Sequence, residues 1–229
     1  MLFGAVGDLH GDFDALDAIL ARHPEIDLWL CPGDLASESG EYPRPRAPLY
    51  WIKGNNEDFD FVASQPPGSG TIPNLHYIQN GTSVVVSGLR IAGLGGTFAP
   101  TVYDMPAASL PHTNIKNDRR RHFVQEEVLA CSSMSSIDVF LSHEAARPYP
   151  IQHTQASGGR GRLDAGKTQI NEVLSAMRPR LHLFGHHHQY TVAERQHVMS
   201  IGLDKASASY LIFDGKTLAH QHLTTCRWP

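Results

Sequence analysis

The chain has few cysteines and no long apolar segment. Its 229 residues include only three cysteines, Cys31, Cys131 and Cys226, at wide spacing. An odd, scattered set indicates neither a disulfide framework nor a thiolate metal cluster, and it favours a reducing compartment. The apolar opening stops at Asp8, which is too short for a signal-peptide core, and no later run approaches the length of a membrane span. We therefore expect a cytoplasmic protein without a membrane segment.

The chain also lacks a strong excess of charge of either sign. Its formal net charge is −4, and its charged fraction of 18% and apolar fraction of 41% are near those of ordinary globular proteins. This balance argues against a protein dedicated to wrapping DNA or coating a membrane, although it is compatible with a local basic groove. Length and composition predict one globular domain that spans residues 1–229.

Histidine, in contrast, is abundant. The fourteen histidines exceed what packing requires and indicate metal or acid–base chemistry. Short apolar runs typical of strands occupy residues 2–6, 27–31, 49–52, 137–141 and 181–184. Apolar residues at helical spacing over residues 13–20, 118–131 and 168–177 alternate with these runs. The alternation predicts an α/β fold.

The middle and the end of the chain predict antiparallel pairing. Asn80-Gly81 separates strand-like runs at residues 76–79 and 82–87, which is the strongest hairpin signal in the sequence. Runs at residues 90–94, 197–201, 210–213 and 218–222 predict further strands, the last two joined through an Asp214-Gly215 turn. Residues 144–166 show no apolar periodicity. Because long loops in compact domains are usually functional, we expect this segment beside the active site.

Five blocks of polar residues each follow a predicted strand. The carboxyl ends of strands in an α/β fold converge on one crevice, so blocks that are distant in sequence can share one site. Together they provide carboxylate oxygen, amide oxygen and imidazole nitrogen, a donor set that suits divalent ions such as Mn, Fe, Ni or Zn. In chain order the blocks are Gly7-Asp8-Leu9-His10, Gly33-Asp34, Gly54-Asn55-Asn56-Glu57, Ser142-His143 and Gly185-His186-His187-His188.

This ordered set resembles the motifs of the calcineurin-like metallophosphoesterase superfamily, over residues 8–188. The resemblance implies a four-layer α/β sandwich, in which two mixed β-sheets are flanked by helices. It also implies two divalent metal ions, for which we favour manganese. By resemblance, one ion would be bound by Asp8, His10 and His188, the other by Asn55, His143 and His186, and Asp34 would bridge them.

A pair of divalent ions suits the hydrolysis of a phosphate ester. Two such cations and two aspartates leave a net positive site for an anionic substrate. Ions about 4 Å apart lower the pKa of a bridging water and present hydroxide in line with the P–O bond. Asn55 adds an amide oxygen without the negative charge that would repel the phosphate. The predicted reaction is phosphoester hydrolysis by a metal-bridging hydroxide.

One position departs from the superfamily pattern. Many members carry a histidine that protonates or orients the leaving group, whereas this chain has Asn56 in that place. Asparagine cannot act as an acid, so a loss of about 10² to 10⁴ in rate is expected if no other group replaces it. His187, His112, His122 or His153 could replace it, or the substrate could have a good leaving group. The sequence leaves these alternatives open.

Three loop arginines, Arg147, Arg160 and Arg162, are candidate substrate contacts. Arginine forks suit a phosphate or phosphodiester, and the alternative is an ordinary solvated charged loop. For His187 we expect a half-exposed side chain, because the resembling families do not use the middle histidine as a ligand. Residues 88–97 are similar to the strand and turn of lariat debranching enzymes, which favours a diester substrate.

The preferred hypothesis is therefore a phosphodiesterase, with nucleic acid among its possible substrates. The alternatives are a phosphomonoesterase, including a protein phosphatase, and a non-catalytic scaffold that keeps the fold. A scaffold is expected to have lost ligands, whereas all seven are present in this chain.

Overall fold

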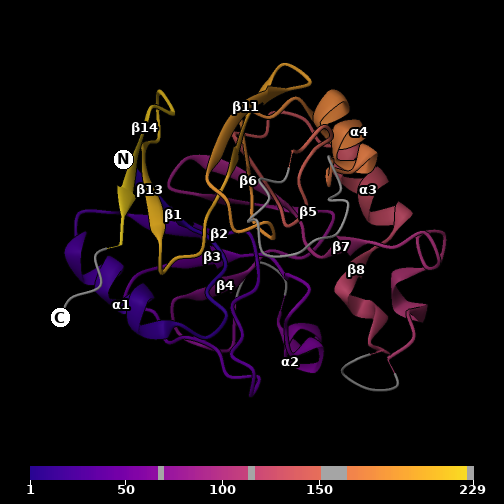
Figure 1. Cartoon of the computed structure of the whole chain (residues 1–229), viewed down its shortest axis with the longest axis horizontal. Coiled ribbons are helices and arrows are strands. Elements are labelled where there is room, and N and C mark those ends of the chain that lie inside the picture. The colour runs from indigo at the N-terminus through magenta and orange to yellow at the C-terminus, as the bar shows by residue number, and fades with distance from the viewer. Residues whose placement is uncertain (67–69, 113–116, 151–163, 226–229) are drawn as a thin grey trace, which may run out of the picture.

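The computed structural model describes residues 1–66, 70–112, 117–150 and 164–225. These residues form two six-stranded sheets that pack face to face, with helices on the outer side of each sheet. Figure 1 shows α1 (Phe13–Arg22) on one side of the strands, and α3 (Gln125–Ser132) and α4 (Thr168–Met177) on the other. The predicted four-layer α/β sandwich is confirmed.

The first sheet is mixed. Its strands β1 to β4 are parallel to one another, whereas β13 and β14 add antiparallel strands at the other side of β1. Ala5, for example, pairs with Leu30 in the parallel direction and with Leu211 in the antiparallel direction. Across the sheet the order is β14 (His220–Thr224), β13 (Ser209–Asp214), β1 (Leu2–Val6), β2 (Leu28–Cys31), β3 (Leu49–Trp51) and β4 (Leu75–Tyr77).

The second sheet is also mixed. Its four central strands are parallel, and an antiparallel strand lies at each edge. Across the sheet the order is β11 (Thr191–Arg195), β12 (Val198–Gly202), β10 (Leu181–Phe184), β9 (Val139–Ser142), β6 (Leu89–Leu94) and β5 (Thr82–Val86).

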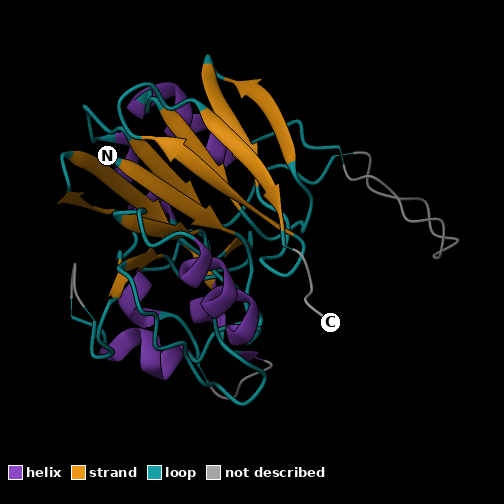
Figure 2. Cartoon of the chain, turned by 90° about the vertical axis from the view of Figure 1, so that its left-hand side faces the viewer, coloured by secondary structure: helices purple, strands orange, loops and turns teal. Residues whose placement is uncertain are grey.

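Apolar side chains fill the space between the layers. The strands of both sheets contribute to one central cluster, in which the rings of Phe3 and Phe213 are stacked with centroids 4.7 Å apart. On the outer faces, α1 buries Leu16, Ile19 and Leu20 against the first sheet, and α4 buries one apolar side against the second. Burying one such side chain contributes about 1.5–3 kcal/mol. Figure 2 shows the strands of the sheets with helices on either side of them.

The hairpin predicted around Asn80-Gly81 is wrong. The strands before and after this turn, β4 and β5, belong to different sheets, and β5 forms its hairpin with β6 instead. The side chain of Asn80 accepts a hydrogen bond from the backbone N–H of Gly95 at 2.6 Å and donates one to its carbonyl at 3.0 Å. These hydrogen bonds with Gly95 fix Asn80-Gly81 in the connection that leads from the first sheet to the second.

One further expectation needs correction. Residues 118–131 do not form one helix, since the 3₁₀ turn η3 (Arg119–Arg121) and strand β8 (His122–Phe123) precede α3. Strand β8 pairs with β7 (Thr97–Phe98), which leaves the Phe123 ring fully buried. The strand expected at residues 197–201 corresponds to β12, which is antiparallel to β11 in the second sheet, and β13 and β14 form the expected C-terminal hairpin.

The remaining elements are short. A helix, α2 (Phe59–Ser64), begins at Asp58, whose carboxylate accepts hydrogen bonds from the backbone N–H groups of Asp60 and Phe61. A second 3₁₀ turn is η1 (Ala107–Ser109). Within the described ranges, no helix combines the length and the apolar character needed to cross a bilayer.

Candidate metal centre

The candidate site lies where parallel strands of both sheets end. The loop after β1 carries Asp8 and His10, and those after β2 and β3 carry Asp34 and Asn55. The second sheet supplies the other three side chains from the loops after β9 and β10. The structure brings together all seven residues that the resemblance assigned to metals, namely Asp8, His10, Asp34, Asn55, His143, His186 and His188.

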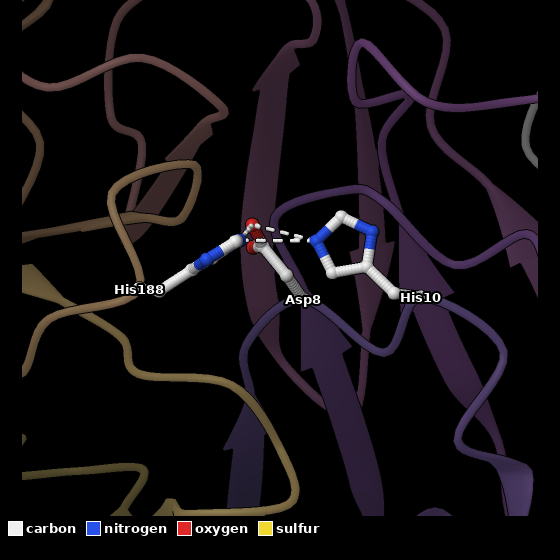
Figure 3. Close-up of side chains that lie close together, drawn as sticks. All are labelled: Asp8, His10 and His188. Atoms are coloured by element: carbon white, nitrogen blue, oxygen red, sulfur yellow. Dashed lines mark hydrogen bonds and ion pairs between the residues drawn. The ribbon is translucent and has the colours of Figure 1, made fainter.

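A first group of donors surrounds Asp8. Figure 3 shows the rings of His10 and His188 pointing toward the Asp8 carboxylate from opposite sides. The Oδ2 atom of Asp8 lies 3.0 Å from Nε2 of His188 and 3.9 Å from Nε2 of His10, and the two ring nitrogens lie 3.0 Å apart. All three donors are within 4.8 Å of one another, which is close enough to share one ion.

A second group of donors surrounds Asp34. Its Oδ2 atom lies 3.6 Å from Nε2 of His143 and 3.7 Å from Nε2 of His10, so it faces ligands of both groups. The same nitrogen of His143 lies 3.0 Å from the amide oxygen of Asn55, and the rings of His143 and His186 have centroids 5.0 Å apart. This geometry is compatible with a bridging role for Asp34.

Asp8 also joins the second group. Asp8, Asp34 and His143 form a second cluster whose ligand atoms lie within 4.8 Å of one another. The backbone N–H of His186 donates to both carboxylate oxygens of Asp8, at 3.2 and 3.0 Å. The two carboxylates therefore lie at the centre of the site, and the imidazoles lie around them.

The donor set fits divalent metal ions. Carboxylate and amide oxygens together with imidazole nitrogens suit borderline ions of the first transition series. A ligating histidine is usually oriented by a partner on its other nitrogen, and Nδ1 of His143 lies 2.7 Å from the carbonyl oxygen of Pro32. The seven residues thus offer a donor set that suits divalent metal ions, in which Asp8 belongs to both candidate groups.

The site is buried on one side and open on the other. Asp8, Asp34 and His143 are at most 1% exposed, whereas the side chains of His10 and His188 are 29% and 35% exposed. The candidate site is therefore accessible from the side of these two histidines.

Four of the ligand residues have left-handed backbone conformations. The φ angles are 48° for His10, 55° for Asp34, 67° for His186 and 49° for His188. A non-glycine residue in this region costs about 1–3 kcal/mol, and such strain persists only where the surroundings enforce it. The sharp turns direct successive side chains from the strand ends into one centre.

Two glycines allow the loops to approach the carboxylates closely. A Cβ atom at Gly54 would overlap Oδ1 of Asp34, and one at Gly185 would overlap Oδ1 of Asp8. The glycines that open these two motifs therefore have a steric cause, because a side chain there would displace Asp34 or Asp8.

The buried Glu57 carboxylate joins the loops after β2 and β3. It accepts backbone hydrogen bonds from Leu35 at 3.1 Å, Ala36 at 3.2 Å and Gly54 at 3.1 Å, and one from the Tyr42 hydroxyl at 2.9 Å. Burial raises the pKa of Glu57 to about 7. Glu57 thus fixes the two loops that carry the candidate ligands Asp34 and Asn55.

The electrostatics of the centre favour an ionised Asp34 between neutral and charged imidazoles. Burial raises the pKa of Asp34, but His143 and the hydrogen bonds from Asn56 outweigh it, so the net pKa lies below its usual value. Burial lowers the pKa of His143, but the charges of Asp34 and Asp8 raise it by more, so the net pKa lies above its usual value. Burial, followed by the charge of His143, lowers the pKa of His186 to about 4.

Asn56 contacts Asp34 directly. Its backbone N–H donates to Oδ1 of Asp34 and its side-chain amide donates to Oδ2, both at 2.8 Å. An amide engaged in this way orients the carboxylate rather than transferring a proton.

The expectation of a half-exposed His187 is wrong. Its side chain is 9% exposed and stacks on the ring of Tyr149 with centroids 4.6 Å apart, while its Nε2 atom faces Glu144 at 3.8 Å. Burial lowers the pKa of His187 to about 3. The middle histidine therefore packs behind the metal ligands, where the Tyr149 ring covers it.

A cavity of about 920 Å³ adjoins the centre. His10, Asn55, Asn56 and His188 form its metal side. Its other walls are lined by the loop after β2 and the start of α2, by Lys205, and by the segment that carries His112, Asp118, Arg120 and Arg121.

The structure describes only Arg147 of the three predicted substrate arginines. Arg147 is not among the described residues that line it, and its Nε atom donates to Asp164 at 2.8 Å. Arg160 and Arg162 lie outside the described residues. Their contact with substrate stays a prediction.

The cations that do line the cavity were missed. Arg120 and Arg121 come from η3, and Lys205 comes from the loop between β12 and β13. The run of three arginines at residues 119–121 was visible in the sequence, but its assignment to a helix concealed its meaning. Lys205 belongs to no motif that could have signalled it.

Buried carboxylates surrounded by imidazoles, at the edge of a cavity, are typical of the metal centres of hydrolases. The model of the calcineurin-like phosphoesterase family matches residues 1–190, and the chain belongs to this family.

Known proteins with similar sequences include lariat debranching enzymes. The one from Schizosaccharomyces pombe is 26% identical over 232 residues, which cover 86% of this chain and 50% of the enzyme. The one from Drosophila melanogaster is 26% identical over 250 residues, which cover 90% of this chain and 45% of the enzyme. This chain therefore spans about half the length of these relatives. Among solved structures, TT1561 of Thermus thermophilus has the same fold, with a TM-score of 0.66, 14% identity, and coverage of 98% of this chain and 99% of that chain.

Proposed function

We propose that this chain is a cytoplasmic phosphodiesterase that works with two divalent metal ions, Mn²⁺ being preferred, and that its substrates are nucleic-acid diesters. The cavity beside His10 and His188 carries this proposal, because about 920 Å³ accommodates a phosphate with a substituent on each side. The lariat debranching enzymes among its relatives support a nucleic-acid substrate.

The residues of the site divide the work of hydrolysis. When bound, the two ions supply an activated water and neutralise charge on the phosphate. Asn56 holds the Asp34 carboxylate by two hydrogen bonds, and Glu57 holds the loops that carry Asp34 and Asn55. Lys205 lines the cavity together with His10, where its charge attracts the anionic ester.

The leaving group requires a proton donor other than Asn56. Of the four histidines that could replace it, His187 is buried behind the ligands and His153 lies outside the described residues. Nδ1 of His122 lies 3.0 Å from the Thr97 hydroxyl, and burial lowers the pKa of this histidine to about 4. His112 lines the cavity, so we assign it this role.

Matched chromogenic substrates test the proposal. With Mn²⁺ supplied, the protein is expected to hydrolyse bis-nitrophenyl phosphate faster than nitrophenyl phosphate. Asp8→Asn and His186→Ala are expected to abolish both activities, because each removes a metal ligand. Faster turnover of the monoester would overturn the diester assignment. Fewer than one bound ion per chain, together with no hydrolysis of either ester, would favour a scaffold.

A further inference from the structure

The cavity has walls of opposite charge. Glu38, Asp58 and Asp60 lie on one wall, in the loop after β2 and at the start of α2. Arg120 and Arg121, in η3, form a basic wall of the same cavity, and Arg120 contacts Asp60. An anionic group beyond the metals is therefore attracted to one side of the cavity and repelled from the other.

The basic wall is firmly built. Lys53, only 7% exposed, donates through Nζ to the backbone carbonyls of Arg120 at 2.7 Å and His122 at 3.3 Å. Asp118, 6% exposed, accepts hydrogen bonds from Nε and Nη2 of Arg120, and its backbone carbonyl accepts one from Nε of Arg121 at 3.0 Å. Both guanidinium groups are thus oriented by buried partners before any ligand arrives.

One contact of the basic wall is easily exchanged. Nη2 of Arg120 also lies 2.8 Å from Oδ1 of Asp60, whose side chain is 86% exposed. An ion pair with so exposed a partner contributes only about 0–1 kcal/mol. A phosphate that binds arginine through a charge-assisted, bidentate contact is a stronger partner than this solvated carboxylate.

We propose that Arg120 and Arg121 form a second phosphate subsite, which takes the phosphate next to the one that is hydrolysed, and that Asp60 occupies part of this subsite in the free protein. The inference rests on the proposed phosphodiesterase function and narrows its substrate class to oligonucleotides. A diester with a single phosphate leaves the subsite unused.

Activity is measured on nitrophenyl esters of thymidine 5′-phosphate that carry zero, one or two further nucleotides on the 3′ side. The scissile bond is the same in all three, so the ratio of kcat/KM between longer and shorter esters reports the subsite. A charge-assisted hydrogen bond corresponds to about tenfold or more in affinity, and the parent ratio is expected to be of this size. The ratio is expected to fall as salt is raised.

Three variants locate the effect. Arg121→Gln is expected to lower the ratio about tenfold. Asp60→Asn is expected to raise it several-fold, because it removes the competing carboxylate. Arg119→Gln is the matched control, since Arg119 belongs to the same turn but is exposed and is not among the residues that line the cavity. It is expected to leave the ratio unchanged.

Binding separates this inference from the proposed function. Fluorescence anisotropy of a labelled trithymidylate with metal-free protein is expected to show weaker binding for Arg121→Gln, tighter binding for Asp60→Asn and no change for Arg119→Gln. That binding pattern supports the subsite whether or not the parent protein shows turnover. Absence of turnover would overturn only the phosphodiesterase proposal. A parent ratio near one, or equal effects of Arg119→Gln and Arg121→Gln in both measurements, would overturn the subsite.

Discussion

The amide group of Asn56 donates a 2.8 Å hydrogen bond to Oδ2 of Asp34, the oxygen that also faces His10 and His143. In many relatives this position supplies a proton donor, whereas here it supplies a fixed support for a central carboxylate. In this chain, residue 56 therefore supports the Asp34 carboxylate instead of providing a proton for the leaving group.

Removing this support is expected to weaken metal binding. In Asn56→Ala, Asp34 loses its side-chain donor, and loss of such a partner lowers metal affinity about 10- to 100-fold. Titration of Mn²⁺ by calorimetry measures the effect. Asn171→Ala is the control, because it removes a similar amide hydrogen bond, to the Arg147 carbonyl, from a segment that carries no ligand. Equal affinities for Asn56→Ala and the parent would contradict the support role.

A methyl group at Gly185 is expected to damage the centre. The Cβ atom of Gly185→Ala would overlap Oδ1 of Asp8, so the carboxylate or the loop must move. We expect a loss of Mn²⁺ affinity and of activity while the protein remains folded, as judged by calorimetry and circular dichroism. Gly88→Ala is the comparison, since its Cβ would meet open space at a φ of 82°. That variant should lose about 1 kcal/mol of stability and keep its metal affinity.

Replacing His112 is expected to change the dependence on the leaving group. If His112 delivers the proton, His112→Gln should lower turnover of alkyl phosphodiesters by about 10² to 10⁴ relative to nitrophenyl esters. The ratio of the two rates is the measurement. The exposed His197 provides the control variant His197→Gln, which should leave that ratio unchanged. An unaltered ratio in His112→Gln would assign the proton to solvent or to another group.

Acid is expected to destabilise the metal-free protein, in part through His182. This fully buried ring has Ser142 and Ser200 as hydrogen-bond partners, and burial lowers its pKa from 6.5 to about 3. Only the unfolded state gains the proton between these values. The free energy of unfolding should therefore fall as pH decreases below 6.5, by about 1.4 kcal/mol per unit for each such histidine.

The matched variants for this prediction are His182→Gln and the exposed His222→Gln. Urea unfolding between pH 4 and 7 should show a shallower pH dependence for His182→Gln, with a slope reduced by about one proton. His222→Gln should retain the parent slope. An identical slope in His182→Gln and the parent would show that His182 does not carry this proton difference.

The blocks of candidate ligands could be predicted because each one is marked by a local pattern, a short apolar strand followed by polar residues. Each ligand follows a short buried strand, and parallel strands place their carboxyl ends at one edge. Asp8 and His188, although 180 positions apart in the chain, thus required no knowledge of the sheet order to be assigned to one site.

The errors arose where distant partners outweigh local pattern. Asn80-Gly81 is a strong hairpin signal, yet the hydrogen bonds between Asn80 and Gly95 fix it as a crossover. Phe123 has helical spacing relative to its neighbours, but pairing of β8 with β7 takes it into a strand. The cavity cations were missed for the same reason, because only the folded chain places Lys205 and Arg121 around one cavity.

The buried Lys53 has a mechanical consequence. Its Nζ atom holds the turn that carries the cavity arginines, its own carbonyl accepts a hydrogen bond from Gly96 at 2.8 Å, and it lies two positions before Asn55. Lys53 therefore connects the turn that carries Arg120 and Arg121 with the backbone beside the candidate metal ligand Asn55.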